Sequence, residues 1–264
     1  MYRLPRFFCP KSKTKLIRLG KPNDGGYCIP EKSLDEANIL FSFGLDDNWS
    51  FEEHFKKKVE AKIICFDNSV NNKYWIKRFL KDIIYFDFKK NLSEQFMRFF
   101  TYFKYKKFFR QKNVYHIIKH IDSNSIIVPE QIKKNFINLQ DILKDWGDNC
   151  FFLKMDIDFN EYHILDDILQ HQKNMIAMVI EFHSCDLMSE KIKLFIEKIN
   201  LDLVHIHVNN YGSVTKDRFP TVIEFTFSAK KYNLKRKENE NNFPVESFDQ
   251  TNNKNDQDAP IAFI

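Results

Sequence analysis

The chain has 264 residues, 43% of them hydrophobic, which is enough for one sizeable core and too little for two independent ones. Its 41 basic and 36 acidic residues give a net charge of +5, far from the dense basic surface of a dedicated nucleic-acid binder, so anionic small molecules remain plausible partners. There is no apolar run of the roughly 20 residues that span a bilayer, no signal-peptide pattern and no metal-ligand spacing among the five cysteines. We therefore expect one cytoplasmic domain, residues 1–264, with reduced thiols.

Apolar β-favouring runs alternate with amphipathic stretches along the chain, which is typical of a mostly parallel sheet with helices on both faces. In chain order, the predicted strands are residues 39–43, 62–66, 83–86, 151–157, 175–182, 203–207 and 222–227. The predicted helices are residues 50–59, 74–80, 160–170 and 189–199, the last with Ser189 as its N-terminal cap.

Three segments lie outside this alternation. Residues 1–37 are expected to form a cap segment before the first strand. Residues 88–135 look like an inserted lid that is helical, aromatic and basic, either with solvated Lys and Arg side chains or with Lys106 and Lys107 capturing phosphate. Residues 230–264 form a polar tail with an apolar end, for which we expect a mobile or loosely docked segment.

The carboxyl ends of the predicted strands carry the candidate site, because ligands of open α/β sheets bind there. The run at 151–157 stops at Asp156 and Asp158 and then turns into a helix pattern. Gly44 follows the first predicted strand and permits close backbone approach. Asp67 follows the second, where a carboxylate commonly accepts both hydroxyls of a ribose, although an ordinary turn aspartate is the alternative.

The type of cofactor that we expect depends on a motif that the sequence lacks. No Gly-x-Gly-x-x-Gly follows the first predicted strand, which counts against NAD and favours a cofactor without phosphates. The turn Asp24-Gly25-Gly26-Tyr27 could close over the amino-acid end of such a cofactor, or be a plain loop.

An ordered set of motifs resembles the FkbM-like group of S-adenosylmethionine-dependent methyltransferases. The motifs are Arg18-Leu-Gly20, Asp24-Gly-Gly-Tyr27, Phe41-Ser-Phe-Gly44, Ser50-Phe-Glu52, Cys65-Phe-Asp67, Leu153-Lys-Met-Asp156 with Glu161, Val179-Ile-Glu181-Phe-His183 and His205-Ile-His207-Val-Asn209-Asn210-Tyr211, followed by a last strand at 219–226.

This resemblance implies a Rossmann-like, seven-stranded class I methyltransferase sheet, mostly parallel with an antiparallel final strand and helices on both faces. It also implies S-adenosylmethionine as cofactor, with Gly44 near the methionine moiety, Asp67 on the ribose and Asp87 near the adenine, and with Asp24, Gly26, Tyr27 and Asp156 completing the cofactor site. Two positions depart from the group: the glycine of its Asp-x-Glu-Gly motif is replaced by Phe159, and Val208 stands where relatives often have glycine.

For catalysis, the sulfonium supplies an activated methyl group, so the enzyme positions and deprotonates the acceptor hydroxyl. We expect His183 to be the base and His207 to be the next candidate, with Asp156 and Glu181 at the same sheet edge. The alternative is a divalent metal ion held by Asp156, Glu181, His183 and His207.

Relatives of this kind often methylate sugar hydroxyls, so the expected substrate is a nucleotide-activated sugar for capsule or lipooligosaccharide biosynthesis. The expected substrate-binding residues are His205, Asn209, Asn210, Lys106 and Lys107. The alternatives are an RNA or other acidic substrate, with the basic insertion as a stacking platform, and a non-catalytic methyltransferase-like protein that binds a partner.

Overall fold

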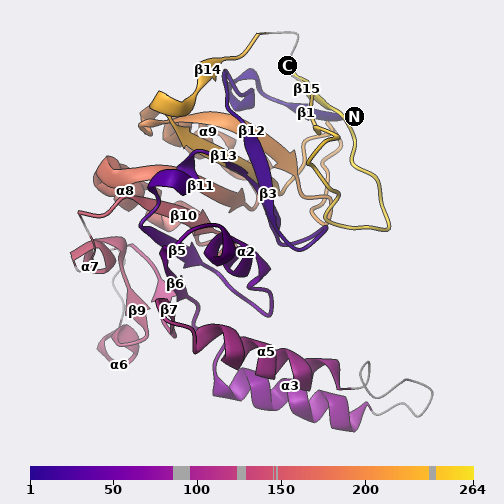
Figure 1. Ribbon diagram of the computed structural model, residues 1–264. Helices are drawn as coiled ribbons and strands as arrows, with labels where there is room; N and C mark the ends of the chain where they lie inside the picture. The colour runs from indigo at the N-terminus through magenta and orange to yellow at the C-terminus, as the bar shows by residue number, and fades with distance from the viewer. Residues whose placement is uncertain (86–95, 124–128, 145, 147, 238–241) are drawn as a thin grey trace.

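The structure is a computed structural model that describes residues 1–85, 96–123, 129–144, 146, 148–237 and 242–264 (Figure 1). A seven-stranded sheet lies at its centre, in the order β12-β13-β11-β10-β5-β6-β7. Its strands are β5 (Ile39–Phe43), β6 (Lys62–Phe66), β7 (Val114–Ile117), β10 (Phe151–Met155), β11 (Met175–Phe182), β12 (Leu201–Val208) and β13 (Ile223–Ala229). Within this sheet, β13 runs antiparallel to both of its neighbours, and the other pairs are parallel. This arrangement confirms the predicted seven-stranded, mostly parallel sheet with an antiparallel final strand.

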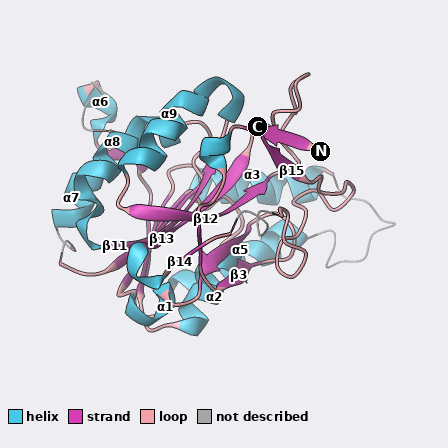
Figure 2. Ribbon diagram, turned by 90° about the horizontal axis from the view of Figure 1, so that it is seen from above, coloured by secondary structure: helices cyan, strands magenta, loops and turns pink. Residues whose placement is uncertain are grey.

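Helices cover both faces of the sheet because the strands are apolar on both sides (Figure 2). In β5, Ile39, Phe41 and Phe43 belong to one core, together with α8 (Glu161–His171) and α9 (Cys185–Lys198). Leu40 belongs to the second core, which it shares with α2 (Ser50–Lys58). The alternation of side chains along a strand therefore divides the interior into two cores.

Smaller elements surround the sheet. The two-stranded pairs are β3 (Leu16–Gly20) with β4 (Gly26–Pro30), β1 (Tyr2–Leu4) with β15 (Ile261–Phe263), β2 (Ser12–Lys13) with β14 (Leu234–Lys235), and β8 (His120–Ile121) with β9 (Phe136–Ile137). The short helices are α1 (Ser33–Glu36), α6 (Glu130–Lys133), α7 (Leu139–Lys144) and the 3₁₀ turns η1 (Arg6–Phe8), η2 (Gln172–Asn174) and η3 (Lys230–Tyr232). In the part of the chain that is described, no helix has the length and apolarity to cross a membrane.

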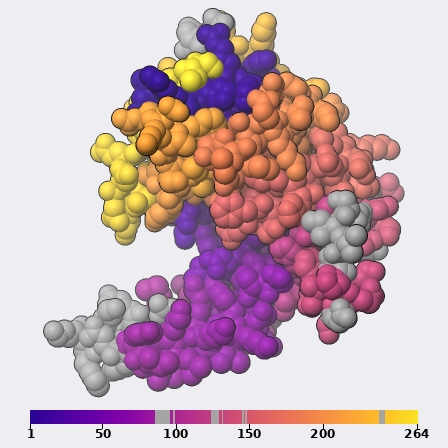
Figure 3. Space-filling view, turned by 180° about the vertical axis from the view of Figure 1, so that it is seen from behind, coloured from indigo at the N-terminus to yellow at the C-terminus, as the bar shows by residue number. Residues whose placement is uncertain are grey.

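The prediction of a strand at residues 83–86 is wrong. Residues 83 and 84 are the last two residues of the helix α3 (Asn72–Ile84), and Phe86 lies outside the described residues. The third parallel strand is β7, which falls inside the segment predicted as an insertion. The connection from β6 to β7 contains α3 and α5 (Met97–Phe109), which pack against each other as an antiparallel hairpin and project from the body (Figure 3). Asp87, expected near the adenine, also lies outside the described residues.

Two further expectations differ from the structure. Helix α9 begins at Cys185, and its N-terminal cap is Ser184 in the left-handed region, not Ser189. The described part of the C-terminal tail is firmly docked: Phe243 and Asn252 are 3% and 2% exposed, and β15 pairs with the amino-terminal β1. The polar composition suggested solvation, but Asp249, Asn252 and Asp258 of the tail bond to His205, Glu224 and His207 of the sheet, which are buried.

Candidate functional site

A pocket of about 430 Å³ lies at the carboxyl ends of β5, β6, β10 and β11. The predicted site residues that line it are Asp24, Tyr27, Gly44, Asp67, Asp156, Glu181 and His183. The predicted residues that do not line it are Gly26, Lys106, Lys107, His205, His207, Asn209 and Asn210. The structure therefore brings the motifs of four strands to one place, and it leaves all five predicted substrate-binding residues outside the lining of this pocket.

Gly44 has a backbone role in this pocket. Its φ is 81°, and a Cβ atom built on it would lie 1.6 Å from the carbonyl oxygen of Asp156. The Gly44 carbonyl accepts a hydrogen bond of 2.6 Å from Nζ of the buried Lys154. The loops after β5 and β10 can approach this closely because glycine carries no side chain.

Asp67 holds the loop after β5 against the end of β6. Its Oδ2 accepts the backbone N–H groups of Leu45 (2.9 Å) and Asp46 (3.0 Å), and its Oδ1 accepts the N–H and hydroxyl groups of Ser69 (2.7 and 2.6 Å). Burial acts to raise the pKa of Asp67, but these hydrogen bonds outweigh it, and the pKa is lowered. The turn role that the sequence offered as an alternative is thus present in the structure.

The β3–β4 hairpin brings two more predicted residues to the pocket. The hydroxyl of Tyr27 donates a 2.9 Å hydrogen bond to Oδ2 of Asp156. Burial raises the pKa of Asp24, which also lines the pocket. Gly26 does not line the pocket and begins strand β4, where a Cβ atom would lie 2.5 Å from the carbonyl oxygen of Lys21.

His183 is paired with a buried carboxylate. Its Nδ1 lies 2.8 Å from Oε1 of Glu161, a residue with 0% exposure, and its Nε2 lies 3.4 Å from Oε1 of Glu181 and 3.8 Å from Oδ1 of Asp158. Burial acts to lower the pKa of His183, but the hydrogen bond and charge of Glu161, with the charges of Asp156 and Asp158, raise it above the ordinary value. Glu161 therefore fixes the ring, as in the carboxylate–histidine pairs of general bases.

The role of Glu161 was missed at the level of sequence, where it entered only as part of a motif. The position of Glu161 in the sequence could have revealed this role, because Glu161 recurs at helical spacing with Ile164, Leu165 and Ile168 on the buried face of α8. A carboxylate on an apolar helix face needs a polar partner, because an unpaired buried charge is costly. His183, which directly follows strand β11, is that partner.

The pocket is rich in carboxylates. Seven acidic side chains line it, against three lysines and two histidines. Burial raises the pKa of Glu181 well above its ordinary range, and the charges of Asp156 and Glu224 add to this. The excess of acidic side chains favours a ligand that presents a positive group to this pocket.

The loop that lacks the expected glycine has an unusual backbone. Asp158 and Phe159 have φ angles of 47° and 72°, a region that L-residues other than Asn and Asp rarely adopt. The ring of Phe159 is exposed and lies with its centroid 5.1 Å from that of His183. The chain thus keeps a left-handed turn without glycine, and it places an aromatic ring beside the imidazole.

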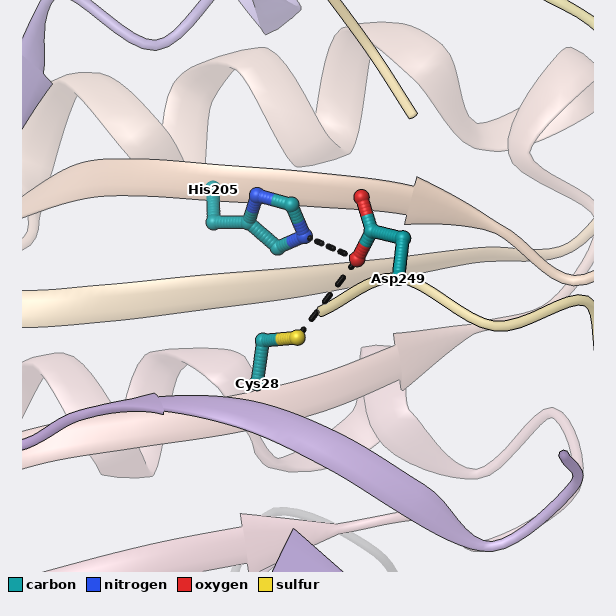
Figure 4. A group of neighbouring side chains, drawn as sticks. All are labelled: Cys28, His205 and Asp249. Atoms are coloured by element: carbon teal, nitrogen blue, oxygen red, sulfur yellow. Dashed lines mark hydrogen bonds and ion pairs between the residues drawn. The ribbon is translucent and has the colours of Figure 1, made fainter. Parts of the chain in front are cut away.

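His205 and His207 lie under the C-terminal tail. The Nε2 atom of His207 lies 2.9 Å from Oδ2 of Asp258, its Nδ1 lies 3.4 Å from Glu224, and the resulting attraction outweighs burial and raises its pKa to about 10. Nε2 of His205 lies 2.9 Å from Oδ1 of Asp249, which also accepts from the Cys28 thiol (Figure 4). The two histidines share one face, as expected, but each one is hydrogen-bonded in this structure to a carboxylate of the tail.

The two asparagines are also engaged. Nδ2 of Asn209 donates to Oε2 of Glu181 at 3.0 Å. Asn210 bonds to the tail through Thr251 (2.6 Å) and the backbone N–H of Asn253 (2.7 Å). Asn209 therefore acts on the pocket through Glu181, and Asn210 anchors the tail.

The two predicted phosphate-binding lysines lie on α5. Lys107 and Lys104 line a groove that shares Asp47 and Asn48 with the pocket. Nζ of Lys106 instead lies over the Tyr102 ring, 5.7 Å from its centroid. Only one of the two is therefore next to the pocket.

Among the described residues, two groups of side chains have the types and spacing that a metal ion needs. One is Asp156, Asp158 and His183 in the pocket, and the other is Cys28, His205 and Asp249 under the tail. Of the four ligands expected from the sequence, Asp156 and His183 belong to the first group, whereas Glu181 and His207 do not, and Asp158 was not expected. The pocket therefore offers three ligands of mixed oxygen and nitrogen type.

Three solved structures are similar to this chain. A precorrin-6y C5,15-methyltransferase from Geobacter metallireducens is 13% identical, with 75% of this chain and 84% of that chain covered and a TM-score of 0.36. A fibrillarin pre-rRNA processing protein from Methanococcus jannaschii is 9% identical (82% and 83% covered, TM-score 0.38), and a spermidine synthase from Thermotoga maritima is 12% identical (90% and 73% covered, TM-score 0.38). No protein-family model and no curated protein sequence matches the chain. With identities and TM-scores this low, the similarities assign it no activity, cofactor or substrate.

Proposed function

We propose that this protein is an S-adenosylmethionine-dependent O-methyltransferase that acts on a sugar hydroxyl, and that the sugar is nucleotide-activated and serves capsule or lipooligosaccharide biosynthesis. The observation that carries the proposal is the His183–Glu161 pair, whose second imidazole nitrogen, Nε2, faces a carboxylate-rich pocket at the carboxyl ends of a class I methyltransferase sheet. The sugar and its biosynthetic role rest on the resemblance of the motifs to the FkbM-like group.

The pocket fits the cofactor in two respects. Gly44 leaves its backbone open beside Asp156, and the carboxylates supply negative charge for a sulfonium and an α-amino group. The proposed residues are Gly44 with Asp156, Asp24 and Tyr27 for the amino-acid end, and Asp67 for the ribose. The ribose role of Asp67 requires the exposed Ser69 hydroxyl to release Oδ1. S-adenosylmethionine supplies an electrophilic methyl group when bound.

The chain's own residues prepare the acceptor. Glu161 accepts the Nδ1 proton of His183, so the other ring nitrogen, Nε2, is free to take a proton from a hydroxyl in the pocket. The raised pKa of His183 makes it a stronger base than a free imidazole, and it also means that the base is active only after deprotonation. Turnover should therefore rise with pH through a value above 6.5.

The proposed substrate spans the pocket and the adjoining groove. A sugar hydroxyl would lie beside His183, and a diphosphate would reach Lys104 and Lys107 past the shared residue Asp47. Asn209 contributes through its hydrogen bond to Glu181. The acidic side chains that line the pocket disfavour an RNA substrate, because they would repel the phosphates next to the reacting nucleotide.

A divalent ion on Asp156, Asp158 and His183 is the alternative means of activating the hydroxyl. It would occupy His183, so the histidine would act as a ligand and not as a base. Turnover in excess EDTA distinguishes the two: full activity supports the base, and loss with rescue by Mg²⁺ or Mn²⁺ supports the ion.

The direct test is methyl transfer. Wild-type protein is incubated with S-adenosylmethionine and a panel of nucleotide sugars, and the products are examined by mass spectrometry for the gain of one methyl group. His183→Ala should lower turnover by about 10²-fold to 10⁴-fold. The matched control is His171→Ala, at the far end of α8, which should keep wild-type activity. Wild-type turnover in His183→Ala would contradict the mechanism.

A further inference from the structure

The α3–α5 hairpin carries an apolar surface that no other described part of the chain covers. Ile76, Leu80 and Ile83 follow one another at helical spacing on α3 and are 59%, 46% and 49% exposed. Beside them lies a row of three aromatic rings, Phe79, Phe99 and Phe103, which are 37%, 36% and 53% exposed. We call these six residues the hairpin face.

The hairpin face is continuous across the two helices. The Phe79 and Phe99 ring centroids are 5.3 Å apart, and those of Phe99 and Phe103 are 4.8 Å apart. The hairpin also stands away from the sheet, so its outer side is accessible (Figure 3). Clustered apolar residues that remain exposed in a folded chain mark a surface that binds something.

Positive charge lies along one side of this surface. The two helices contain eight Lys and Arg residues and one acidic residue, Asp82, which is 1% exposed. Lys73, Lys77 and Lys81 are exposed and recur every four residues along α3, which places them in a row beside the apolar stripe. The surface therefore combines an apolar centre with a cationic border.

We propose that the hairpin face binds the surface of a membrane that contains anionic lipid. Apolar side chains would enter the region between headgroups and acyl chains, and lysines would extend to the lipid phosphates. The charge is complementary to an anionic surface, whereas a second copy of the hairpin would bring lysines against lysines. The aliphatic residues favour a bilayer over RNA, since bases stack on aromatic rings and gain little from Ile or Leu. This inference does not depend on the proposed reaction.

Co-sedimentation with vesicles tests the proposal. Wild-type protein should bind vesicles of equal parts phosphatidylcholine and phosphatidylglycerol, bind pure phosphatidylcholine much more weakly, and lose binding as the salt concentration rises. Lys77→Glu/Lys81→Glu should lower the partition coefficient by at least about 20-fold, since each lysine near an anionic surface contributes about 1 kcal/mol. Leu80→Asp/Ile83→Asp should abolish binding. Circular dichroism should show that both variants remain folded, because the replaced side chains are exposed.

Matched controls lie on α9. Leu187→Asp replaces a leucine that is 80% exposed, and Lys191→Glu/Lys198→Glu reverses two exposed lysines. Both controls should bind vesicles like the wild type. The proposal is overturned if wild-type protein does not bind anionic vesicles, or if the hairpin variants bind as well as the controls do. It is also overturned if the hairpin variants lose binding to a fluorescent single-stranded RNA, or lose self-association in sedimentation, while vesicle binding is unchanged.

Discussion

His207 should make the stability of the protein depend on pH, because it links strand β12 to Asp258 of the tail. The folded state holds the imidazole proton up to a pH of about 10, while an unfolded chain releases it near 6.5. Between these values the folded state binds more protons, so raising the pH favours unfolding. The stabilisation is complete below pH 6.5 and is lost as the pH approaches 10.

The magnitude follows from the difference of about 3.5 between the two pKa values. At about 1.4 kcal/mol for each pH unit, the protonated histidine contributes on the order of 5 kcal/mol, of which about 3 kcal/mol should disappear between pH 7 and pH 9. We would measure free energies of unfolding in urea at both pH values for wild type and His207→Gln. Other groups titrate in both proteins, so the informative quantity is the stability difference between them. It should shrink by about 3 kcal/mol. A difference that is the same at both pH values would show that His207 holds no extra proton in the folded state.

Three other outcomes are expected around the pocket. Glu161→Gln should lower turnover by about 10²-fold and move the inflection of the pH–rate profile to lower pH, because Glu161 raises the pKa of His183; an unmoved inflection would exclude the pairing. Gly44→Ala should lower turnover by about 10²-fold, since its Cβ would collide with the Asp156 carbonyl, and near-normal kinetics would show that the two loops can separate freely. Phe159→Asn should raise the free energy of unfolding by about 1 kcal/mol in urea titrations, since Asn tolerates a positive φ; a loss of stability would show that the ring's packing outweighs the strain.

The buried strands were predicted well from the sequence, because their apolar composition is a local property of each segment. The bounds of β5, β6 and β11 agree with the apolar runs that predicted them. Strands buried on both faces are uninterrupted apolar segments between polar turns. The strand bounds also give the positions of the carboxyl ends. From these positions the sequence predicted that Asp67, Asp156 and His183 lie in one pocket.

The third strand was misplaced for a physical reason. Ile83 and Ile84 belong to an apolar stripe of helix α3 that begins at Ile76. This stripe is exposed to solvent, and the sequence gives no sign of that exposure. The strand β7 is a four-residue edge strand, Val114–Ile117, that contains Tyr115 and His116 and has one neighbour in the sheet. Short edge strands carry a weak apolar signal because one side of them is open.

The tail and its histidines could not be predicted because their partners are distant in the sequence. His205 and His207 were correctly placed on one face, but Asp249 and Asp258, more than 40 residues further on, lay in a segment whose composition predicted a mobile or loosely docked tail. Composition describes average solvation, and it does not reveal that a carboxylate will meet a buried imidazole.

We infer that the acidic pocket at the strand ends accepts a sulfonium cofactor. Calorimetric titration of the intact protein with S-adenosylmethionine, and with NAD in parallel, measures this binding. We expect saturable binding of one S-adenosylmethionine per chain and no binding of NAD. An absence of S-adenosylmethionine binding, or preferred binding of NAD, would rule out this role for the pocket.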